Sequence, residues 1–252
     1  MATPSDGAAW VTGASGGIGR AVALKLVENG FDVWATARTE EALQTLADEA
    51  KGKLHVLPGD VTDLVAMRQA VDTITARGPL ALAILNAGIY TPQRAREFNA
   101  EIAGKMVDVN LKGVINGLEP VMAHMMARKS GVIALTASVA GYRGLPASGP
   151  YSATKAGLIA LAESLAMDLV DHNVRMSVIN PGFVETEATS VNDFEMPFLI
   201  QPEEAARRIV KGLSRPGFEI AFPRRFELIL KTIGLLPNRA YLWSVRKLLG
   251  MG

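Results

Sequence analysis

Short apolar runs alternate along the chain with longer segments in which apolar side chains recur every three or four residues. The first run, 8–12, ends at glycine residues and predicts a buried strand. The next segment, 17–29, is apolar at helical spacing and is followed by Gly30, a residue type that commonly ends helices. The whole pattern predicts strands at 8–12, 31–36, 53–57, 81–85, 132–136, 174–179 and 218–222, and helices at 17–29, 40–50, 62–77, 104–128, 150–172 and from Pro202 onward.

This alternation predicts an α/β fold in which parallel strands are joined by right-handed helical crossovers. The strands are almost uniformly apolar, as expected for a sheet that helices cover on both faces. We therefore expect a doubly wound parallel sheet of about seven strands in three αβα layers. The 252 residues contain no internal repeat and no linker-like stretch, so residues 1–252 are predicted to form a single domain.

Composition excludes several classes of protein. The formal net charge of +1 gives no global field that would attract nucleic acid, so we expect no nucleic-acid partner. The chain has no cysteine, and its three histidines (His55, His124 and His172) are not at ligand spacing, so we expect no metal site. The first residues lack the pattern of a signal peptide, and no apolar run reaches the ~18 residues of a spanning helix. We expect a cytoplasmic protein.

A glycine-rich turn, Thr12 to Gly19, follows the first predicted strand. Gly13, Gly17 and Gly19 permit a tight turn and a close approach of the backbone to a ligand. The N-terminus of the following helix offers free N–H groups and a positive dipole end to a pyrophosphate. The spacing G-x-x-x-G-x-G differs from the usual G-x-G-x-x-G fingerprint. The turn favours a Rossmann-type dinucleotide site, and the alternative is an ordinary strand-to-helix turn.

The end of the second predicted strand bears on the choice of dinucleotide. NAD sites commonly carry an acidic residue there for the ribose 2′-hydroxyl. Residues 36–39 contain no acid and one base, Arg38, which can pair with a 2′-phosphate. We predict NADP(H) as the preferred cofactor, with NAD(H) as the alternative. If Arg38 does not bind a phosphate, it is a solvated charge at a strand end.

Candidate catalytic chemistry lies in the segment YSATK, residues 151–155. Tyr151 and Lys155 are at i and i+4, which places them on one face of a helix. A free phenol has a pKa near ~10, and a nearby ammonium would lower that pKa toward the working range of a general acid or base. Ser138 follows the fifth predicted strand. Taken singly, these are ordinary surface or strand-end residues, but their combination behind a glycine turn indicates a catalytic set.

These residues together resemble the short-chain dehydrogenase/reductase family, in its ordinary-length branch, over about residues 8–222. The resemblance implies that the Asp60 side chain and the Val61 backbone bind the adenine ring. It also implies that Val184 and Thr186 hold the nicotinamide carboxamide. The matched positions are Gly13, Ser15, Gly17, Ile18 and Gly19 in the turn; Asp60 and Val61; Asn86, Ala87 and Gly88 after the fourth strand; Asn110, Ser138, Tyr151 and Lys155 as the catalytic set; and Pro181, Gly182, Val184 and Thr186.

The resemblance implies hydride transfer between the nicotinamide and a carbonyl or secondary alcohol. Tyr151 would act as general acid or base, Ser138 would hydrogen-bond the substrate oxygen, and Lys155 would hold the nicotinamide ribose. Asn110 would position a water in a proton relay. One departure is Gly16, which stands where many NADP-preferring relatives carry a base. A homodimer or homotetramer is implied by resemblance alone, and the alternative function is a non-catalytic dinucleotide-binding or redox-sensing protein.

Two segments lie outside the most specific motifs. Residues 183–201 lack a regular pattern and are predicted to be a substrate flap, with a plain surface loop as the alternative. Residues 224–252, here called the C-terminal extension, are amphipathic and carry six bases against one acid. We weigh three roles for this extension: a helix packed on the core or on a neighbouring subunit, a lid over an apolar pocket, and contact with a membrane surface.

The sequence does not identify the substrate. Specificity is expected from the loop after Asn86, from residues 139–149, from the flap and from the C-terminal extension. Their side chains suggest an apolar compound through Tyr142, Leu145, Phe194, Met196, Phe198 and Leu199.

Overall fold

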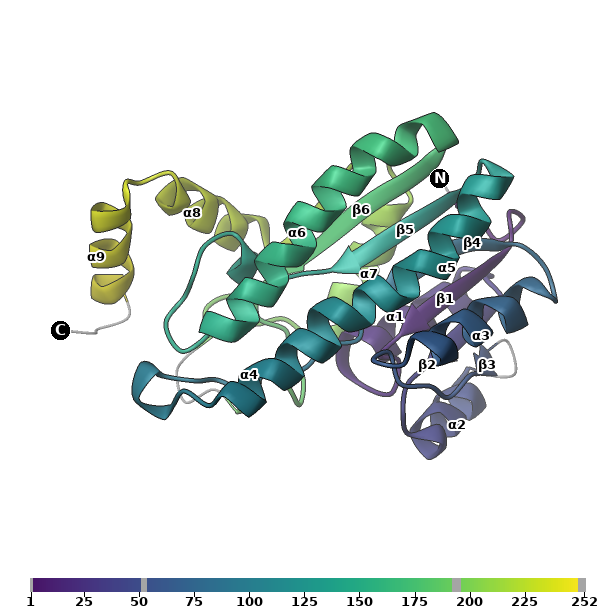
Figure 1. The fold of residues 1–252 in the computed structure, drawn as a ribbon, viewed down its shortest axis with the longest axis horizontal. Helices are drawn as coiled ribbons and strands as arrows, with labels where there is room; N and C mark the ends of the chain where they lie inside the picture. The colour runs from purple at the N-terminus through teal and green to yellow at the C-terminus, as the bar shows by residue number, and fades with distance from the viewer. Residues whose placement is uncertain (1, 51–53, 192–195, 249–252) are drawn as a thin grey trace.

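A computed structural model describes residues 2–50, 54–191 and 196–248, and it contains one seven-stranded sheet in which every paired strand is parallel. The strand order is β3-β2-β1-β4-β5-β6-β7, so the chain winds outward in both directions from β1 and β4 (Figure 1). This confirms the predicted doubly wound, Rossmann-type sheet. The strands are β1 (Ala8–Thr12), β2 (Val33–Thr36), β3 (Leu54–Val56), β4 (Leu80–Leu85), β5 (Gly131–Thr136), β6 (Val174–Pro181) and β7 (Glu219–Phe222).

Helices cover both faces of the sheet and complete the three layers. On one face α1 packs against α7, and on the other α5 packs against α3 while α6 packs against α4. Each face has its own buried apolar cluster, as expected for strands that are apolar on both sides. The helices of the described residues are α1 (Gly17–Glu28), α2 (Glu40–Glu49), α3 (Leu64–Thr75), α4 (Ala100–Val107), α5 (Gly113–Arg128), α6 (Gly149–Leu169), α7 (Pro202–Leu213), α8 (Arg224–Gly234) and α9 (Asn238–Leu248).

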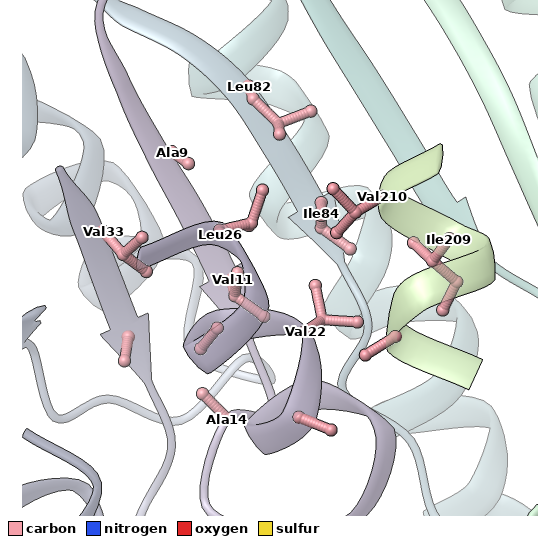
Figure 2. Close-up of a cluster of buried hydrophobic side chains, with 14 of the residues drawn as sticks. Ala9, Val11, Ala14, Val22, Leu26, Val33, Leu82, Ile84, Ile209 and Val210 are labelled. Carbon is pink, nitrogen blue, oxygen red and sulfur yellow. The ribbon is translucent and has the colours of Figure 1, made fainter. Parts of the chain in front are cut away.

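The cluster on the α1/α7 face shows how the sequence pattern becomes packing (Figure 2). Val22 and Leu26 are one helical turn apart on α1, and both point at β1, where Val11 is fully buried. Ile209 and Val210 of α7 cover the neighbouring strand β4 from the same side. Because these side chains leave almost no surface in water, the cluster fixes α1, and with it the glycine turn, against the sheet.

The starts of β2 and α3 differ from the prediction for local reasons. The second strand begins at Val33 and not at Phe31, because Phe31 belongs to the end of α1: its N–H donates to Leu26 O at 3.1 Å, and the N–H of Gly30 donates to Val27 O at 2.9 Å. This is a Schellman-type cap, in which Gly30 has a positive φ of +89°. The helix predicted from Thr62 begins at Leu64, because the Asp63 side chain caps it.

The long helix predicted at 104–128 begins earlier and is not regular. Asn99 caps α4 through the N–H groups of Glu101 and Ile102, so the helix starts at Ala100. A π-helical turn, Asp108–Lys112, then separates α4 from α5. Such wide turns are rare and frequently lie at functional sites. This one carries Asn110.

The C-terminal extension folds into two helices, α8 and α9, joined by a short turn. Figure 1 shows them in yellow at one end of the molecule, extending beyond the sheet. Residues 249–252 of the predicted extension lie outside the described residues. None of the helices in the described part of the chain is long and apolar enough to cross a membrane.

Candidate active site

A cavity of about 1050 Å³ lies at the carboxyl ends of the strands, where ligands bind in open parallel sheets. It runs from the glycine turn after β1 to the C-terminal extension. Of the predicted site residues, Asn110 alone does not line it; the others are brought together there, namely Gly13, Ser15, Gly17, Ile18, Gly19, Arg38, Asp60, Val61, Asn86, Ala87, Gly88, Ser138, Tyr151, Lys155, Pro181, Gly182, Val184 and Thr186.

Three glycines of the turn leave no room for a side chain. Gly13 has a φ of +69°, and a Cβ there would come 2.7 Å from Ala87 Cα. A Cβ on Gly19 would come 2.2 Å from Gly13 O, and one on Gly17 would come 2.9 Å from Thr186 Cγ2. The glycine turn therefore lies so close to the segment after β4 and the segment after β6 that a single added carbon atom would clash. Glycine is required at Gly19 by close packing and at Gly13 by its backbone angle as well.

The N-terminus of α1 suits a pyrophosphate. Its N-cap residue is Gly16, which supplies no side-chain cap, and the first turn of α1 contains no acidic residue. The first N–H groups are therefore without a side-chain acceptor, and the dipole of a twelve-residue helix favours an anion there. With the cavity alongside, this donor set fits a dinucleotide.

The adenosine side of the cavity carries Arg38 and Asp60. Arg38 is exposed, lines the cavity and makes no hydrogen bond or ion pair with any other residue of the described chain. The Asp60 carboxylate accepts hydrogen bonds of 2.9 Å from the N–H and the hydroxyl of Thr62. This leaves its second oxygen, Oδ2, for a ligand donor.

Thr12, at the end of β1, was not among the predicted site residues. Its hydroxyl accepts hydrogen bonds from the N–H groups of Asn86 at 2.9 Å and Ala87 at 3.2 Å. The Asn86 amide in turn donates to Thr12 O at 3.2 Å. Thr12 thus joins the glycine turn to the segment after β4. Its place at the carboxyl end of an apolar strand was the only sequence signal that could have indicated it.

Asn110 is fully buried and supports the site from behind. Its amide oxygen accepts from the N–H of Ile89 at 2.7 Å, and its amide nitrogen donates to Ile89 O at 2.9 Å. The nitrogen also lies 3.3 Å from the Thr154 hydroxyl. A Cβ on Gly88 would lie 3.3 Å from Asn110 Oδ1 and 3.5 Å from Lys155 Nζ, so Asn110 and Lys155 flank the same backbone. Asn110 therefore holds the segment after β4 in place.

Ser138, Tyr151 and Lys155 line the same part of the chain's cavity, and Ser138 hydrogen-bonds Tyr151. Lys155 Nζ donates to Thr136 O at 2.7 Å and lies 5.5 Å from the centre of the Tyr151 ring. The Ser138 hydroxyl, at the end of β5, accepts from the N–H of Ala140 at 3.1 Å. Tyr90 packs its ring edge-on against Tyr151, with centres 4.9 Å apart. The helix α6 and the strand β5 thus place an ammonium, a phenol and a hydroxyl in one cavity.

The electrostatics of this group correct one expectation. Burial raises the pKa of the Tyr151 phenol to about 12, although hydrogen bonding with Ser138 acts in the opposite direction. Burial also lowers the pKa of Lys155 to about 8. The predicted lowering of the Tyr151 pKa is wrong for the protein alone, because the cost of burying a phenolate is the largest influence on this group. At neutral pH Tyr151 is a proton donor.

The segment after β6 is organised by Thr189, which the sequence interpretation also missed. Its hydroxyl donates to Val184 O at 2.7 Å and accepts from the N–H of Thr186 at 3.0 Å. Val184 also forms a β-bridge with Ile200, which closes the base of the predicted flap. Part of that flap, 192–195, lies outside the described residues, as does Phe194 among the predicted apolar side chains.

The far end of the cavity is apolar, and much of it comes from the C-terminal extension. Of the predicted specificity side chains, Leu145 lines it, whereas Tyr142, Met196, Phe198 and Leu199 do not. Phe226 packs between Phe183 and Phe198, with ring centres 5.6 and 5.9 Å away. The extension supplies Phe226, Ile229, Leu230, Ile233 and Val245.

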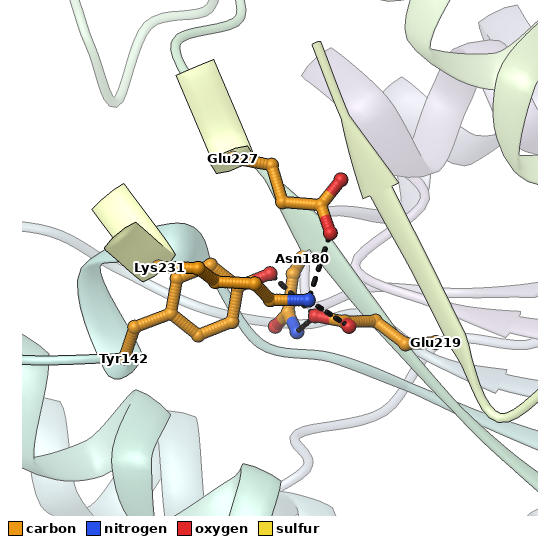
Figure 3. A network of polar contacts seen from close by, with 5 residues as sticks. All are labelled: Tyr142, Asn180, Glu219, Glu227 and Lys231. Carbon is orange, nitrogen blue, oxygen red and sulfur yellow. Dashed lines mark hydrogen bonds and ion pairs between the residues drawn. The ribbon is translucent and has the colours of Figure 1, made fainter. Parts of the chain in front are cut away.

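A polar network holds α8 against the sheet (Figure 3). Glu219 of β7 is its centre and accepts hydrogen bonds from Tyr142, Asn180 and Lys231, and Lys231 also donates to Glu227 at 2.7 Å. Burial alone would raise the pKa of Glu219, but these donors lower it on balance. Burial and the Glu219 carboxylate raise the pKa of Tyr142. Tyr142 is thus a structural phenol and not a substrate contact.

Arg143 holds the turn between α8 and α9. Its guanidinium donates to Gly234 O at 2.8 Å, Leu236 O at 3.0 Å and Asn238 Oδ1 at 2.7 Å. It also lies 3.9 Å from the centre of the Tyr241 ring. Of the three roles considered for the extension, packing on the core is observed, and its apolar side forms a wall of the cavity.

The comparisons agree with this geometry. The family model described as short chain dehydrogenase matches residues 7–195. An uncharacterized oxidoreductase of Myxococcus xanthus is 36% identical over 252 residues, covering 98% of this chain and all of that protein. A variant of actinorhodin polyketide ketoreductase, solved with NADPH, is 27% identical with a TM-score of 0.78, covering 88% of this chain and 97% of that one.

A short chain dehydrogenase/reductase of Burkholderia phymatum, solved with NAD, is similar in fold, with a TM-score of 0.83 at 23% identity over 92% of this chain and 94% of that one. Structural neighbours thus bind either nicotinamide dinucleotide, and the cavity described above offers the donors and the space that such a ligand needs. The family model matches most of the chain, and a relative is similar over its whole length. The chain therefore belongs to the short-chain dehydrogenase/reductase family, in its ordinary-length branch.

Proposed function

We propose that the protein is an NADP(H)-dependent oxidoreductase that transfers hydride between the nicotinamide and the carbonyl or secondary alcohol of an apolar compound. The observation that carries this proposal is that Ser138, Tyr151 and Lys155 line the same cavity as the glycine turn. The apolar wall contributed by α8 and α9 supports an apolar substrate.

When bound, the reduced dinucleotide would supply the hydride, and in the oxidative direction the oxidised dinucleotide would accept it. Tyr151 donates its proton to the carbonyl oxygen, and its raised pKa keeps that proton in place at neutral pH. The Ser138 hydroxyl hydrogen-bonds the same oxygen as negative charge develops on it. Lys155 donates a hydrogen bond to Thr136 O, which fixes its position. There it would hold the ribose hydroxyls next to the nicotinamide and favour reprotonation of the Tyr151 phenol. A protonated Tyr151 at neutral pH is the general acid that carbonyl reduction requires.

The test of the catalytic role is Tyr151→Phe. This variant keeps the ring and removes the proton donor, so reductase kcat should fall roughly 10²–10⁴-fold while dinucleotide binding is retained. Tyr90→Phe is the control, because it removes a different phenol hydroxyl from the same cavity and should keep most of the activity. The measurement is NADPH oxidation over a panel of ketones, aldehydes, quinones and steroids. Near-full activity in Tyr151→Phe would contradict the mechanism, and dinucleotide binding without turnover on any carbonyl would favour a redox-sensing role.

The NADP preference is tested at Arg38, whose exposed guanidinium beside the cavity supports it. A charge-assisted hydrogen bond contributes about 1.5–3 kcal/mol, so Arg38→Gln should lower kcat/KM with NADPH by roughly 10–100-fold. The value with NADH should hardly change. Arg94→Gln, which alters another cavity arginine, serves as the control. A wild-type enzyme with equal kcat/KM for the two cofactors, or with preference for NADH, would refute the assignment.

A further inference from the structure

The outward side of the C-terminal extension exposes large apolar side chains among bases. Leu235 is 86% exposed, Leu228 67%, Trp243 63% and Leu242 60%. Lys231 and Glu227 pair with each other, and Glu227 is the one acidic residue of the extension, so the extension holds no further acid to balance Arg224, Arg225, Arg239 and Lys247. We define the extension surface as Arg224, Arg225, Leu228, Leu235, Arg239, Leu242, Trp243 and Lys247, all of which are exposed.

The inward side of the same helices is already in use. Phe226, Leu230 and Ile233 of α8 and Val245 of α9 line the cavity or pack beside it, and Tyr241 is buried against residues 143–144. The exposed residues therefore occupy the opposite helix faces, as the 3.6-residue period requires. Core packing accounts for one face of each helix and leaves the other without a partner among the described residues.

We propose that the extension surface docks on an anionic phospholipid bilayer. Bases attract the acidic headgroups, and Leu and Trp side chains between them enter the headgroup and acyl boundary. Trp243 suits that boundary, since its ring is amphipathic and Lys247 Nζ lies 4.9 Å from its centre. A second copy of this chain fits less well, because a symmetric contact would bring equal positive charges together. An acidic protein would match the charge but would not require large apolar side chains exposed among the bases.

Docking would place the substrate cavity close to the lipid. A helix with its side chains is about 10–12 Å across, and the opposite faces of α8 and α9 contribute Ile229, Ile233 and Val245 to the apolar end of the cavity. An apolar compound dissolved in the bilayer would then reach the cavity over a short path. The docking itself does not depend on catalysis, so it can be tested separately from the proposed function.

The test is sedimentation of the full chain with large unilamellar vesicles, either of phosphatidylcholine alone or of phosphatidylcholine mixed with phosphatidylserine. We expect binding to the mixed vesicles, release in high salt and weak binding to the neutral ones. Replacing Arg224, Arg225 and Arg239 together by Gln should lower the partition coefficient roughly 100-fold. Leu242→Ser with Trp243→Ser should lower it by roughly tenfold. Neither set touches the cavity, so activity on a water-soluble carbonyl should stay as in the wild type.

Matched controls lie on another face of the molecule. Arg207, Lys211 and Arg215 are exposed, and replacing all three by Gln changes the charge equally without altering the extension surface. Val65→Ser, at a side chain 58% exposed on α3, controls for loss of apolar surface. Wild-type protein that stays in the supernatant, or extension variants that bind like the wild type, would overturn the proposal. A concentration-dependent mass in light scattering that the extension variants abolish, without vesicle binding, would overturn it in favour of self-association.

Discussion

The two ends of the cavity are built by different means. At the cofactor end the segments pack at close range: a Cβ added to Gly13, Gly17 or Gly19 would meet a neighbouring atom at 2.2–2.9 Å, and the Thr12 hydroxyl joins the segments by accepting hydrogen bonds from main-chain N–H groups. At the substrate end, long polar side chains such as Arg143 and Lys231 tie helices α8 and α9 to the sheet. The close packing at the cofactor end fits one ligand shape. The side chains at the substrate end can be substituted one at a time without disturbing the sheet.

The largest effect is expected at the cofactor end, from Gly19→Ala. The new methyl group would clash with Gly13 O and Asn86 Nδ2, and neither is the free end of a flexible chain. We expect a loss of about 3 kcal/mol in the free energy of unfolding, the upper range for overpacking, and a roughly 100-fold loss of dinucleotide affinity. Urea unfolding and fluorescence titration with NADPH measure both. Gly104→Ala, where nothing lies within 4 Å of the added atom, is the control and should be close to neutral. A well-folded Gly19→Ala protein with normal affinity would show that the close packing is not needed.

The second effect concerns Lys155, which lies where the two ends meet. It is 3% exposed, and burial lowers its pKa to about 8 from the ordinary lysine value of 10.5. Between these values the unfolded chain binds more protons than the folded one, so stability rises with pH across this window. From pH 8 to pH 10 the wild type should gain about 2 kcal/mol relative to Lys155→Met, because the methionine variant lacks this titration. Parallel urea unfolding curves at both pH values measure the difference, and an equal pH response of the two proteins would contradict the lowered pKa.

The smallest effect is expected at the substrate end, from Arg143→Met. The variant loses the hydrogen bonds to Gly234, Leu236 and Asn238, which we expect to cost about 1.5 kcal/mol and to affect the extension alone. Hydrogen exchange of α9 should become faster and KM for apolar ketones should rise, with NADPH affinity unchanged. Arg68→Met, which breaks an exposed pair with Glu119, is the control and should change none of these. Loss of NADPH affinity in Arg143→Met would show that the two ends are not independent.

The sequence predicted most of the fold because the strands are apolar runs and the helices have a clear period. All of the predicted site residues except Asn110 line the cavity, because the glycine turn and the segments after the strands carry recognisable motifs that are contiguous in sequence. Thr12 was missed because its partners Asn86 and Ala87 are more than seventy residues away along the chain. The raised pKa of Tyr151 could not be foreseen, because it depends on burial, which residue spacing does not report. Tyr142 was assigned to the substrate when its partner is Glu219, for the same reason.

The extension follows β7, a strand at the edge of the sheet, and no strand comes after it among the described residues. Its attachment depends on a few groups that belong to the body of the protein, chiefly the Glu219 carboxylate and the Arg143 guanidinium. A designer could therefore cut the gene after Phe222 and append a foreign helical pair. The graft would need a cation in the second half of its first helix, where Lys231 stands in α8, to meet Glu219, and free carbonyls at its bend for Arg143. Such chimaeras would change the substrate preference by exchanging the extension, and the cofactor end of the cavity would stay the same.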